Sequence, residues 1–516
     1  MNYQYTKLKQ DADFFENIYK YFSRGGYNCI VVENIMNIIV IIITLMFFIF
    51  TCFCLDWNSI SECISESTCH DFKNYIISPT SFNGVIVNIF MFALIVTFLI
   101  DLCLKTIVLV TDIIKFKIYS NFFRYELFIS SEELKAMSWP DIVTRLIAKD
   151  NQLTVEIIVG SIMRKENYLI AIISSNILGY KKNYYTKNFL SLIKIGIIDK
   201  IFDNSNKTKN LSIDYVKIKE ELRNMMIYHS VMFILKLIGI VIDFVIELTT
   251  DIYVNGSYDR LRDWTIYAKL IFREYNELPH IFNERIQKSY IYATKYDQKF
   301  TVHMTNLIMR KIIFLFGLCL TFLMILMMYD DRLLSYITLW NRNLFWWASI
   351  LISCIYFSNI LIVQSSIIDE SSDDIMDKMI KHTHYCPDSW KNRYNKYDTY
   401  DDFKKLFKYK IKNTFYEICS IFIIPYHAYK RSERDLEILA KYIKVNTTYI
   451  EGIGCVYKYS VMKINEEIKE SGQQEQEQQE QKNPEQQDDV SLIINQQTEN
   501  DSKVIQSKHN FWSYYK

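Results

Sequence analysis

The chain has 516 residues, 50% of them hydrophobic, and a formal net charge of +1 at pH 7. This length allows more than one domain, and the balanced charge gives no reason to expect a nucleic-acid partner. The hydrophobic residues are concentrated in long runs, which indicates membrane segments rather than the core of a soluble protein.

Four apolar runs are long enough to cross a bilayer, at about 35–55, 84–104, 312–328 and 345–363. A helix of about 20 residues spans the roughly 30 Å hydrocarbon core. Basic residues precede the first and third runs, such as Arg24 and Arg310, and acidic residues follow them, such as Asp56 and Asp330. Because basic flanks stay on the cytosolic side, we expect both ends of the chain in the cytosol.

Two further apolar segments do not qualify as full spans. The segment 231–248 contains Lys236, Asp243 and Glu247, and each charge costs about 2.5–3.5 kcal/mol at the centre of a membrane helix. The segment at about 415–428 has an apolar stretch of only half a span before Pro425. We therefore predict an all-α integral membrane protein with four transmembrane helices and two re-entrant or partly inserted helices per protomer, together with helical cytosolic segments.

The composition of the intervening segments predicts a simple order of parts. The tail is rich in Gln and Glu and cannot bury enough apolar surface to offset its ordering entropy. The predicted parts are a cytosolic arm at 1–30, the first two transmembrane helices at 31–110 with a lumenal loop at about 56–82, a cytosolic helical region at 111–228, a re-entrant helix at 229–250, a second cytosolic region at 251–309, the third and fourth transmembrane helices at 310–365, cytosolic helices at 366–448 that include the second re-entrant helix at about 415–428, and a mostly disordered tail at 449–516.

The charges of the first re-entrant segment form a stripe. On a helical wheel His229, Lys236, Asp243 and Glu247 fall within roughly 40° of one another. One interpretation is a hydrated groove through which a lipid head group passes while the acyl chains stay in hydrocarbon. The other is a helix that lies flat at the membrane surface with its charges in water. The sequence leaves both interpretations open.

Several blocks of residues, in order over about 14–447, resemble one known family. They are the segment 162–171 (IMRKENYLIA), Trp264 with the run Arg273, Glu274, Tyr275, Asn276, Glu277, Leu278, Pro279 and His280, and the segment 382–390 with His384, Tyr385, Pro387 and Trp390. This pattern resembles the autophagy-related protein 9 family. We call the run 273–280 the signature loop.

The resemblance implies a function and an environment. Members of that family are homotrimeric phospholipid scramblases that act without an energy source during autophagosome formation. They reside on Golgi- and endosome-derived vesicles, at the preautophagosomal structure and on the autophagosome membrane, and work with the lipid-transfer protein autophagy-related protein 2. The resemblance implies neither a cofactor nor an enzyme activity. The alternative is a membrane scaffold or trafficking protein that recruits autophagy factors without transporting lipid.

The remaining motifs are weaker. The signature loop either organises the cytosolic core and the trimer or contacts lipid phosphate, and the sequence does not decide between the two. His382, His384 and Cys386 lack a fourth ligand, so we expect no metal site. Tyr5 and Leu8 fit a tyrosine-based sorting signal for clathrin adaptors, although such a pattern also arises by chance among 38 tyrosines.

Overall fold

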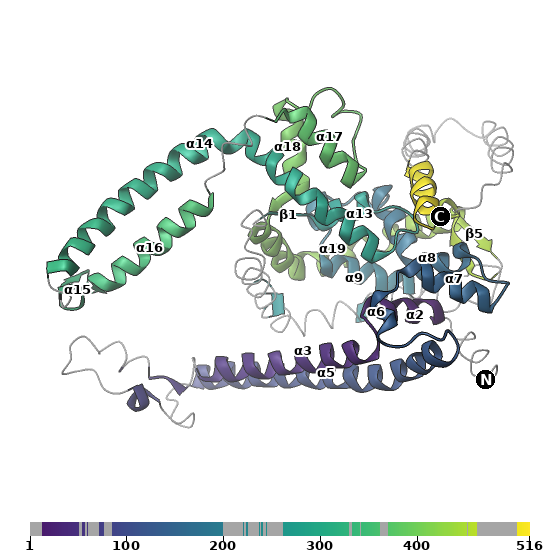
Figure 1. Cartoon of the computed structure of the whole chain (residues 1–516), viewed down its shortest axis with the longest axis horizontal. Helices are drawn as coiled ribbons and strands as arrows, with labels where there is room; N and C mark the ends of the chain where they lie inside the picture. Colours follow the sequence, from purple (N-terminus) through teal and green to yellow (C-terminus); the bar gives the residue numbers. More distant parts are fainter. Residues whose placement is uncertain are drawn as a thin grey trace. The chain divides into compact units, whose positions relative to one another are not determined.

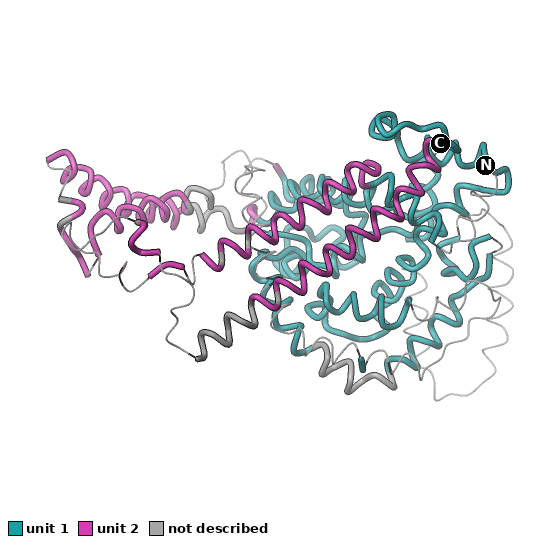
Figure 2. Tube along the Cα trace, turned by 90° about the horizontal axis from the view of Figure 1, so that it is seen from below, with its two compact units in different colours: residues 1–23, 125–297, 371–516 teal, residues 24–124, 298–370 magenta. Residues whose placement is uncertain are grey.

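The computed structural model describes residues 13–50, 54–56, 59, 72–76, 85–199, 220, 223–224, 237, 239–240, 244, 262–329, 333–340, 342–361, 370–450, 452–461 and 503–515. The predicted stripe (His229, Lys236, Asp243 and Glu247) and the predicted sorting signal (Tyr5 and Leu8) lie outside these residues. The chain divides into two compact units (Figure 2). Unit 1 comprises residues 1–23, 125–297 and 371–516, and unit 2 comprises 24–124 and 298–370.

Unit 2 contains both predicted hairpins of membrane helices. Two of its segments, Tyr27–Phe47 and Leu307–Tyr329, are long and apolar enough to span a membrane, with mean hydropathies of 2.4 and 2.6, and Leu344–Tyr356 is a shorter apolar helix. The elements of unit 2 are α3 (Tyr27–Ile49), η2 (Phe72–Tyr75), α5 (Val85–Tyr125), the part of α14 (Pro279–Tyr329) from residue 298, α15 (Leu333–Tyr336), β2 (Thr338–Leu339), β3 (Arg342–Asn343) and α16 (Leu344–Leu361).

The helices α3 and α5 are joined by a polar cluster. The Arg24 guanidinium donates to Asp112 and to Glu33, each at 2.9 Å. The Asn34 amide donates to the same Asp112 oxygen at 2.9 Å, and the Asn34 side chain is buried. The two helices lie side by side (Figure 1), so one carboxylate of α5 holds two polar side chains close to the start of α3.

The turn between α14 and α16 is closed by a short hairpin. β2 pairs with β3 in antiparallel register, Thr338 opposite Asn343. The Trp347 indole donates to the Leu339 carbonyl at 3.1 Å, and Trp340 and Trp346 both lie edge-on to Trp347. Such an aromatic cluster is typical of the interface between lipid and water.

Unit 1 is built around the helix α8 (Val155–Ser174), which carries the segment 162–171. Its N-terminus is capped by Thr154, whose hydroxyl accepts the Ile157 amide. The other elements are α2 (Phe14–Ser23), α6 (Glu133–Ala136), α7 (Trp139–Lys149), η3 (Lys182–Tyr184), α9 (Lys187–Ile193), η4 (Lys194–Asp199), β1 (Arg262–Trp264), α13 (Ile266–Phe272), the start of α14, α17 (Ser372–Thr383), α18 (Tyr397–Leu406), β4 (Phe407–Tyr409), α19 (Lys410–Val445), β5 (Thr447–Ile450), β6 (Gly454–Tyr457) and η8 (Lys458–Ser460).

Two predicted boundaries are corrected. The segment predicted as a short re-entrant helix at about 415–428 lies within α19, which continues through Pro425 to Val445. A proline costs a helix interior about 3 kcal/mol, but Leu439, Ala440 and Ile443 are buried beyond it and favour continuation.

The second correction concerns the tail. The sequence predicted mostly disorder from 449 onward, whereas β5 and β6 form a sheet that reaches Tyr457. Residues 503–515 are helical and pack within unit 1. Their aromatic side chains supply the apolar surface that the Gln/Glu-rich composition lacks.

Candidate functional site

The signature loop connects α13 to α14 and turns at Asn276. Asn276 has a positive φ of 58°, a left-handed conformation that asparagine tolerates better than most residues. Its backbone N–H donates to Asn167 Oδ1 at 3.0 Å, and the Asn167 amide donates back to Asn276 Oδ1 at 2.7 Å. The Asn276 amide also donates to the Ser460 carbonyl at 2.8 Å. The turn is therefore fixed to α8 and to η8 through buried hydrogen bonds.

A buried ion pair closes the loop onto the first turns of α14. Arg285 donates through Nε and one terminal nitrogen to the two carboxylate oxygens of Glu277, at 2.8 and 2.7 Å. The same guanidinium donates to the carbonyls of Phe272 and His382, at 2.9 and 2.6 Å. Glu277 Oε2 also accepts the Glu274 amide at 3.1 Å. Two-point pairing of this kind fixes orientation as well as charge.

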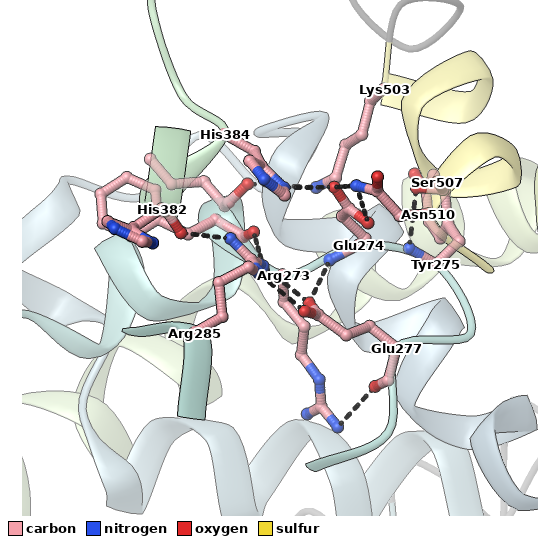
Figure 3. A network of polar contacts seen from close by, with 12 residues as sticks. Arg273, Glu274, Tyr275, Glu277, Arg285, His382, His384, Lys503, Ser507 and Asn510 are labelled. Atoms are coloured by element: carbon pink, nitrogen blue, oxygen red, sulfur yellow. Dashed lines mark hydrogen bonds and ion pairs between the residues drawn. The ribbon is translucent and has the colours of Figure 1, made fainter. Parts of the chain in front are cut away.

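Glu274 is the second buried carboxylate of the loop. Burial raises its pKa, but hydrogen bonds and charge from His384 and the amide of Asn510 outweigh that effect, so the pKa lies below its ordinary value. Glu274 is therefore ionised and accepts hydrogen bonds from His384 Nδ1 at 2.5 Å and from the Asn510 amide at 2.8 and 3.0 Å. Figure 3 shows this carboxylate between the two partners.

Pro279 and His280 begin α14. Proline at a first helical position costs no hydrogen bond, and the preceding Leu278 is fully buried. Burial raises the pKa of Tyr19 to about 12, so its hydroxyl stays protonated. That hydroxyl accepts the His280 backbone N–H at 3.2 Å and donates to His280 Nδ1 at 2.8 Å, which leaves Nε2 to donate to Tyr514 at 3.2 Å.

Trp264 and the downstream block pack against the same region. The Trp264 indole donates to Ser289 of α14 at 3.0 Å, and its ring lies edge-on to Phe272 at 4.9 Å. β1 pairs with β4 so that Trp264 faces Phe407. Tyr385 packs on both Phe272 and Trp390, and the Pro387 carbonyl accepts the Trp390 amide at 2.9 Å. The family-signature residues thus converge although they are more than 100 residues apart in sequence.

The helix at 503–515 covers the signature loop, a contact that the sequence analysis missed. Ser507 accepts the Tyr275 amide at 3.2 Å, and Lys503 donates to the Ile271 carbonyl at 3.3 Å. A cavity of about 250 Å³ remains between this helix and the loop, and Phe511 is among its lining residues. A cluster of aromatic residues could have indicated this docked helix, because Phe511, Trp512, Tyr514 and Tyr515 interrupt an otherwise polar tail.

The carboxylates around the signature loop are all paired, whereas Arg273 Nε and the Tyr275 hydroxyl are buried without a hydrogen-bond partner among the residues that the structure describes. Arg285 and Glu277 are paired, Glu274 is held by His384 and Asn510, and Arg273 pairs with Glu166 of α8 at 3.3 Å. Within the described residues no three His, Cys, Asp or Glu side chains form a group suited to a metal ion. The arrangement therefore acts as a clamp that joins α2, α8, α14, α17 and the helix at 503–515.

Comparisons with known proteins agree with this arrangement. Residues 4–463 match the model of the family described as autophagy protein ATG9. The chain is 26% identical over 483 residues to autophagy-related protein 9 of Saccharomyces cerevisiae (strain ATCC 204508 / S288c), covering 87% of this chain and 47% of the relative. It is 24% identical over 464 residues to autophagy-related protein 9 of Dictyostelium discoideum, covering 86% and 65%.

A solved structure shows the same fold. The cryo-EM structure of Schizosaccharomyces pombe Atg9 has a TM-score of 0.61 and 22% identity to this chain, and the match covers 88% of this chain and 98% of the other. The chain spans about half the length of the yeast relatives it matches. The predicted fold class and family are both confirmed. The chain belongs to the autophagy-related protein 9 family.

Proposed function

We propose that this protein is an energy-independent phospholipid scramblase that re-equilibrates lipids between the leaflets of the growing isolation membrane during autophagosome formation. The observation that carries the proposal is the family match over residues 4–463, which includes the predicted membrane helices and the signature loop. The curated relatives are named for autophagy. The proposal assigns no catalytic residues, because exchange of lipids between leaflets makes and breaks no covalent bond.

The exposed surfaces of the apolar helices support contact with lipid. Only 12% of the span Tyr27–Phe47 and 6% of the span Leu307–Tyr329 are buried. Large apolar side chains on α14 are exposed, among them Phe314, Phe322 and Met328. Contiguous apolar surface of this extent requires a hydrocarbon environment or a partner subunit.

The proposed cellular setting follows from the family. We place the protein on Golgi- and endosome-derived vesicles and on autophagosomal membranes, as a homotrimer with both termini in the cytosol. A lipid-transfer protein such as autophagy-related protein 2 adds lipid to one leaflet only. One-sided delivery would stall as the leaflet areas diverge, and scrambling relieves that imbalance.

The decisive test uses the purified full-length chain in liposomes that carry a fluorescent phospholipid in both leaflets. Dithionite added outside quenches the outer leaflet only, unless the protein exchanges lipid between leaflets. We expect nearly complete quenching without nucleotide. Protection of the inner leaflet equal to that in protein-free liposomes would overturn the proposal.

The alternative, a scaffold that recruits autophagy factors without moving lipid, is favoured by the large folded unit 1. In this unit the helix at 503–515 is docked on the signature loop by hydrogen bonds, which gives a scaffold an ordered structure. A scaffold predicts partner binding by protein that leaves the inner leaflet protected in the same liposomes. The two functions therefore give opposite results in one preparation.

A further inference from the structure

Unit 1 contains a second cavity, of about 510 Å³, which shares no lining residue with the cavity beside the signature loop. It is lined by residues of η3, α9, β1, α13, β4 and α19. Figure 1 labels α9, β1, α13 and α19. Its lining is strongly basic, with five lysines and two acidic residues: Lys182, Lys187, Lys269, Lys408, Lys410, Asp263 and Glu417. The described lining residues therefore carry a formal excess of three positive charges.

Both acidic residues are already engaged. Asp263 pairs with Lys269 at 2.9 Å and accepts the Tyr290 hydroxyl. Glu417 accepts the backbone N–H of Lys187 at 2.5 Å. Burial raises the pKa of Glu417, and the hydrogen bonds from the start of α9 only partly offset this. Asp263 is thus already paired within the cavity wall, and burial disfavours the charged form of Glu417.

Lys408 is the buried member of the set. Its side chain donates to Asn183 Oδ1 at 2.6 Å and lies over the Tyr416 ring at 4.9 Å. Lys408 is only 8% exposed, and burial together with the charge of Lys412 lowers its pKa to about 8. A buried ammonium group held by neutral partners is costly unless an anion approaches it.

The first turn of α19 borders the same cavity. Lys410, Asn413 and Thr414 line it, and the N-cap residue Tyr409 makes no side-chain capping hydrogen bond. The first amides of a helix have no partner within the helix and carry a partial positive charge, which favours an anion. The helix end and the lysines therefore select the same kind of ligand.

One wall of the cavity is apolar. Ile240 and Phe244 line it, and both belong to the segment 229–250 that the sequence predicts to dip into the membrane. A ligand with a phosphate at one end and a glycerol or acyl portion at the other would place the phosphate against the lysines and the less polar portion against Ile240 and Phe244. The wall thus favours a lipid source for the phosphate.

We propose that this cavity binds a phosphomonoester group, either on an anionic lipid head group or on a small soluble phosphate. The shared chemistry is a dianion that accepts hydrogen bonds from Lys187, Lys408 and Lys410 and from the start of α19. This site is distinct from the signature clamp, and its occupancy does not depend on lipid scrambling.

Binding to the full-length protein in detergent tests the proposal. The probes are dioctanoyl phosphatidic acid, glycerol 3-phosphate and, as a zwitterionic comparison, dioctanoyl phosphatidylcholine, measured by titration calorimetry. We expect binding of phosphatidic acid and at least tenfold weaker binding by Lys187→Gln/Lys410→Gln, since the double variant loses two charged hydrogen-bond donors. Neither substitution changes the buried Lys408.

Lys441→Gln is the matched control, because it removes a lysine from the same helix where the side chain is 74% exposed and pairs with Glu437 one turn away. Tighter binding of phosphatidic acid than of glycerol 3-phosphate assigns a lipid source, and equal binding assigns a soluble one. Absence of binding by both phosphates, equal binding of phosphatidylcholine, or equal losses in the double variant and in Lys441→Gln would overturn the proposal. The result is independent of the dithionite assay.

Discussion

Arg285 binds one carboxylate and two backbone carbonyls at the signature loop and its neighbouring segments. It pairs with Glu277 and donates to the carbonyls of Phe272 and His382. The side chains of Arg285 and Glu277 are 13% and 7% exposed. Removing one partner of such a buried pair leaves the other charge uncompensated, at a cost of about 3–5 kcal/mol.

We therefore expect Arg285→Ala to lower the melting temperature of the detergent-solubilised protein by about 6 °C or more. Lys288→Ala is the comparison on the same helix, where the pair with Glu284 is solvent-exposed and contributes little. Tryptophan fluorescence during heating measures both. Equal melting temperatures for the two variants would contradict a stabilising role for the Arg285–Glu277 pair.

His280 makes the stability of unit 1 depend on pH. Burial lowers the pKa of its imidazole below the ordinary value of 6.5, and the weaker charge of Glu284 opposes this. Near neutral pH the folded protein keeps the ring neutral between Tyr19 and Tyr514, while the unfolded chain takes up a proton as the pH falls through its ordinary pKa. The unfolded state then binds more protons than the folded state. The free energy of unfolding therefore decreases as the pH is lowered through the ordinary histidine pKa.

The prediction is a lower melting temperature at about pH 6 than at about pH 7.5, with a smaller difference in His280→Gln. Substitution of the exposed His509 by Gln serves as the control and retains the wild-type difference. Because the readout is the change with pH, a general loss of stability in His280→Gln does not affect it. An unchanged difference in that variant would show that other groups carry the pH dependence.

At the scale of elements, the helix at 503–515 depends on a small number of contacts with the signature loop. Asn510 donates twice to the ionised Glu274, and Ser507 accepts the Tyr275 amide. Loss of hydrogen bonds to a charged group costs about 1.5–3 kcal/mol. Opening of this helix should therefore respond to a single substitution without unfolding of unit 1.

Asn510→Ala should speed hydrogen exchange within 503–515 by about tenfold or more, while exchange in α8 stays as in the wild type. Ile505→Ala, at a side chain that is 69% exposed on the same helix, should leave exchange unchanged. Mass spectrometry of peptic fragments resolves the two regions. Faster exchange of α8 and of 503–515 together would indicate global destabilisation instead of local opening.

The elements differ in how far the sequence could predict them. The long apolar runs predicted α3 and the membrane part of α14, because the length and hydropathy of a run are local properties of the sequence. The continuation of α19 beyond Pro425 depends on burial of Leu439 and Ile443 against distant segments, which a local reading does not contain. The strands β1 and β4 are three residues each, too short for an alternating pattern to develop.

For the whole molecule, the order of the sequence blocks predicted the family but not how they meet. The contact of Asn167 with Asn276 joins residues 109 positions apart, and that of Tyr19 with His280 joins residues 261 apart. Their residue types indicate hydrogen-bonding capacity, whereas their partners follow from the fold. The basic cavity was missed for the same reason, because its lysines come from separate segments between 182 and 410.

The proposed lipid route is a property of the assembled molecule in a bilayer. Lys236, Asp243 and Glu247 share one face of their predicted helix, and charges at membrane depth require water or a polar partner. If that face lines a hydrated groove, replacing the three residues by Leu removes the polar surface that accommodates a passing head group. If the helix lies flat at the interface, the same change only makes its exposed side more apolar.

We expect the triple Leu variant to scramble lipid at least about tenfold more slowly than the wild type. A head group that crosses an apolar path loses its hydration, which adds several kcal/mol to the barrier for transfer. Leu at Lys288, Glu284 and Glu437 changes the formal charge by the same amount on exposed surfaces and provides the matched control. Mass photometry of both variants reports whether the oligomer persists. Wild-type scrambling by an intact triple variant would place the lipid route elsewhere, because a groove that loses its polar lining can no longer lower the barrier for a head group.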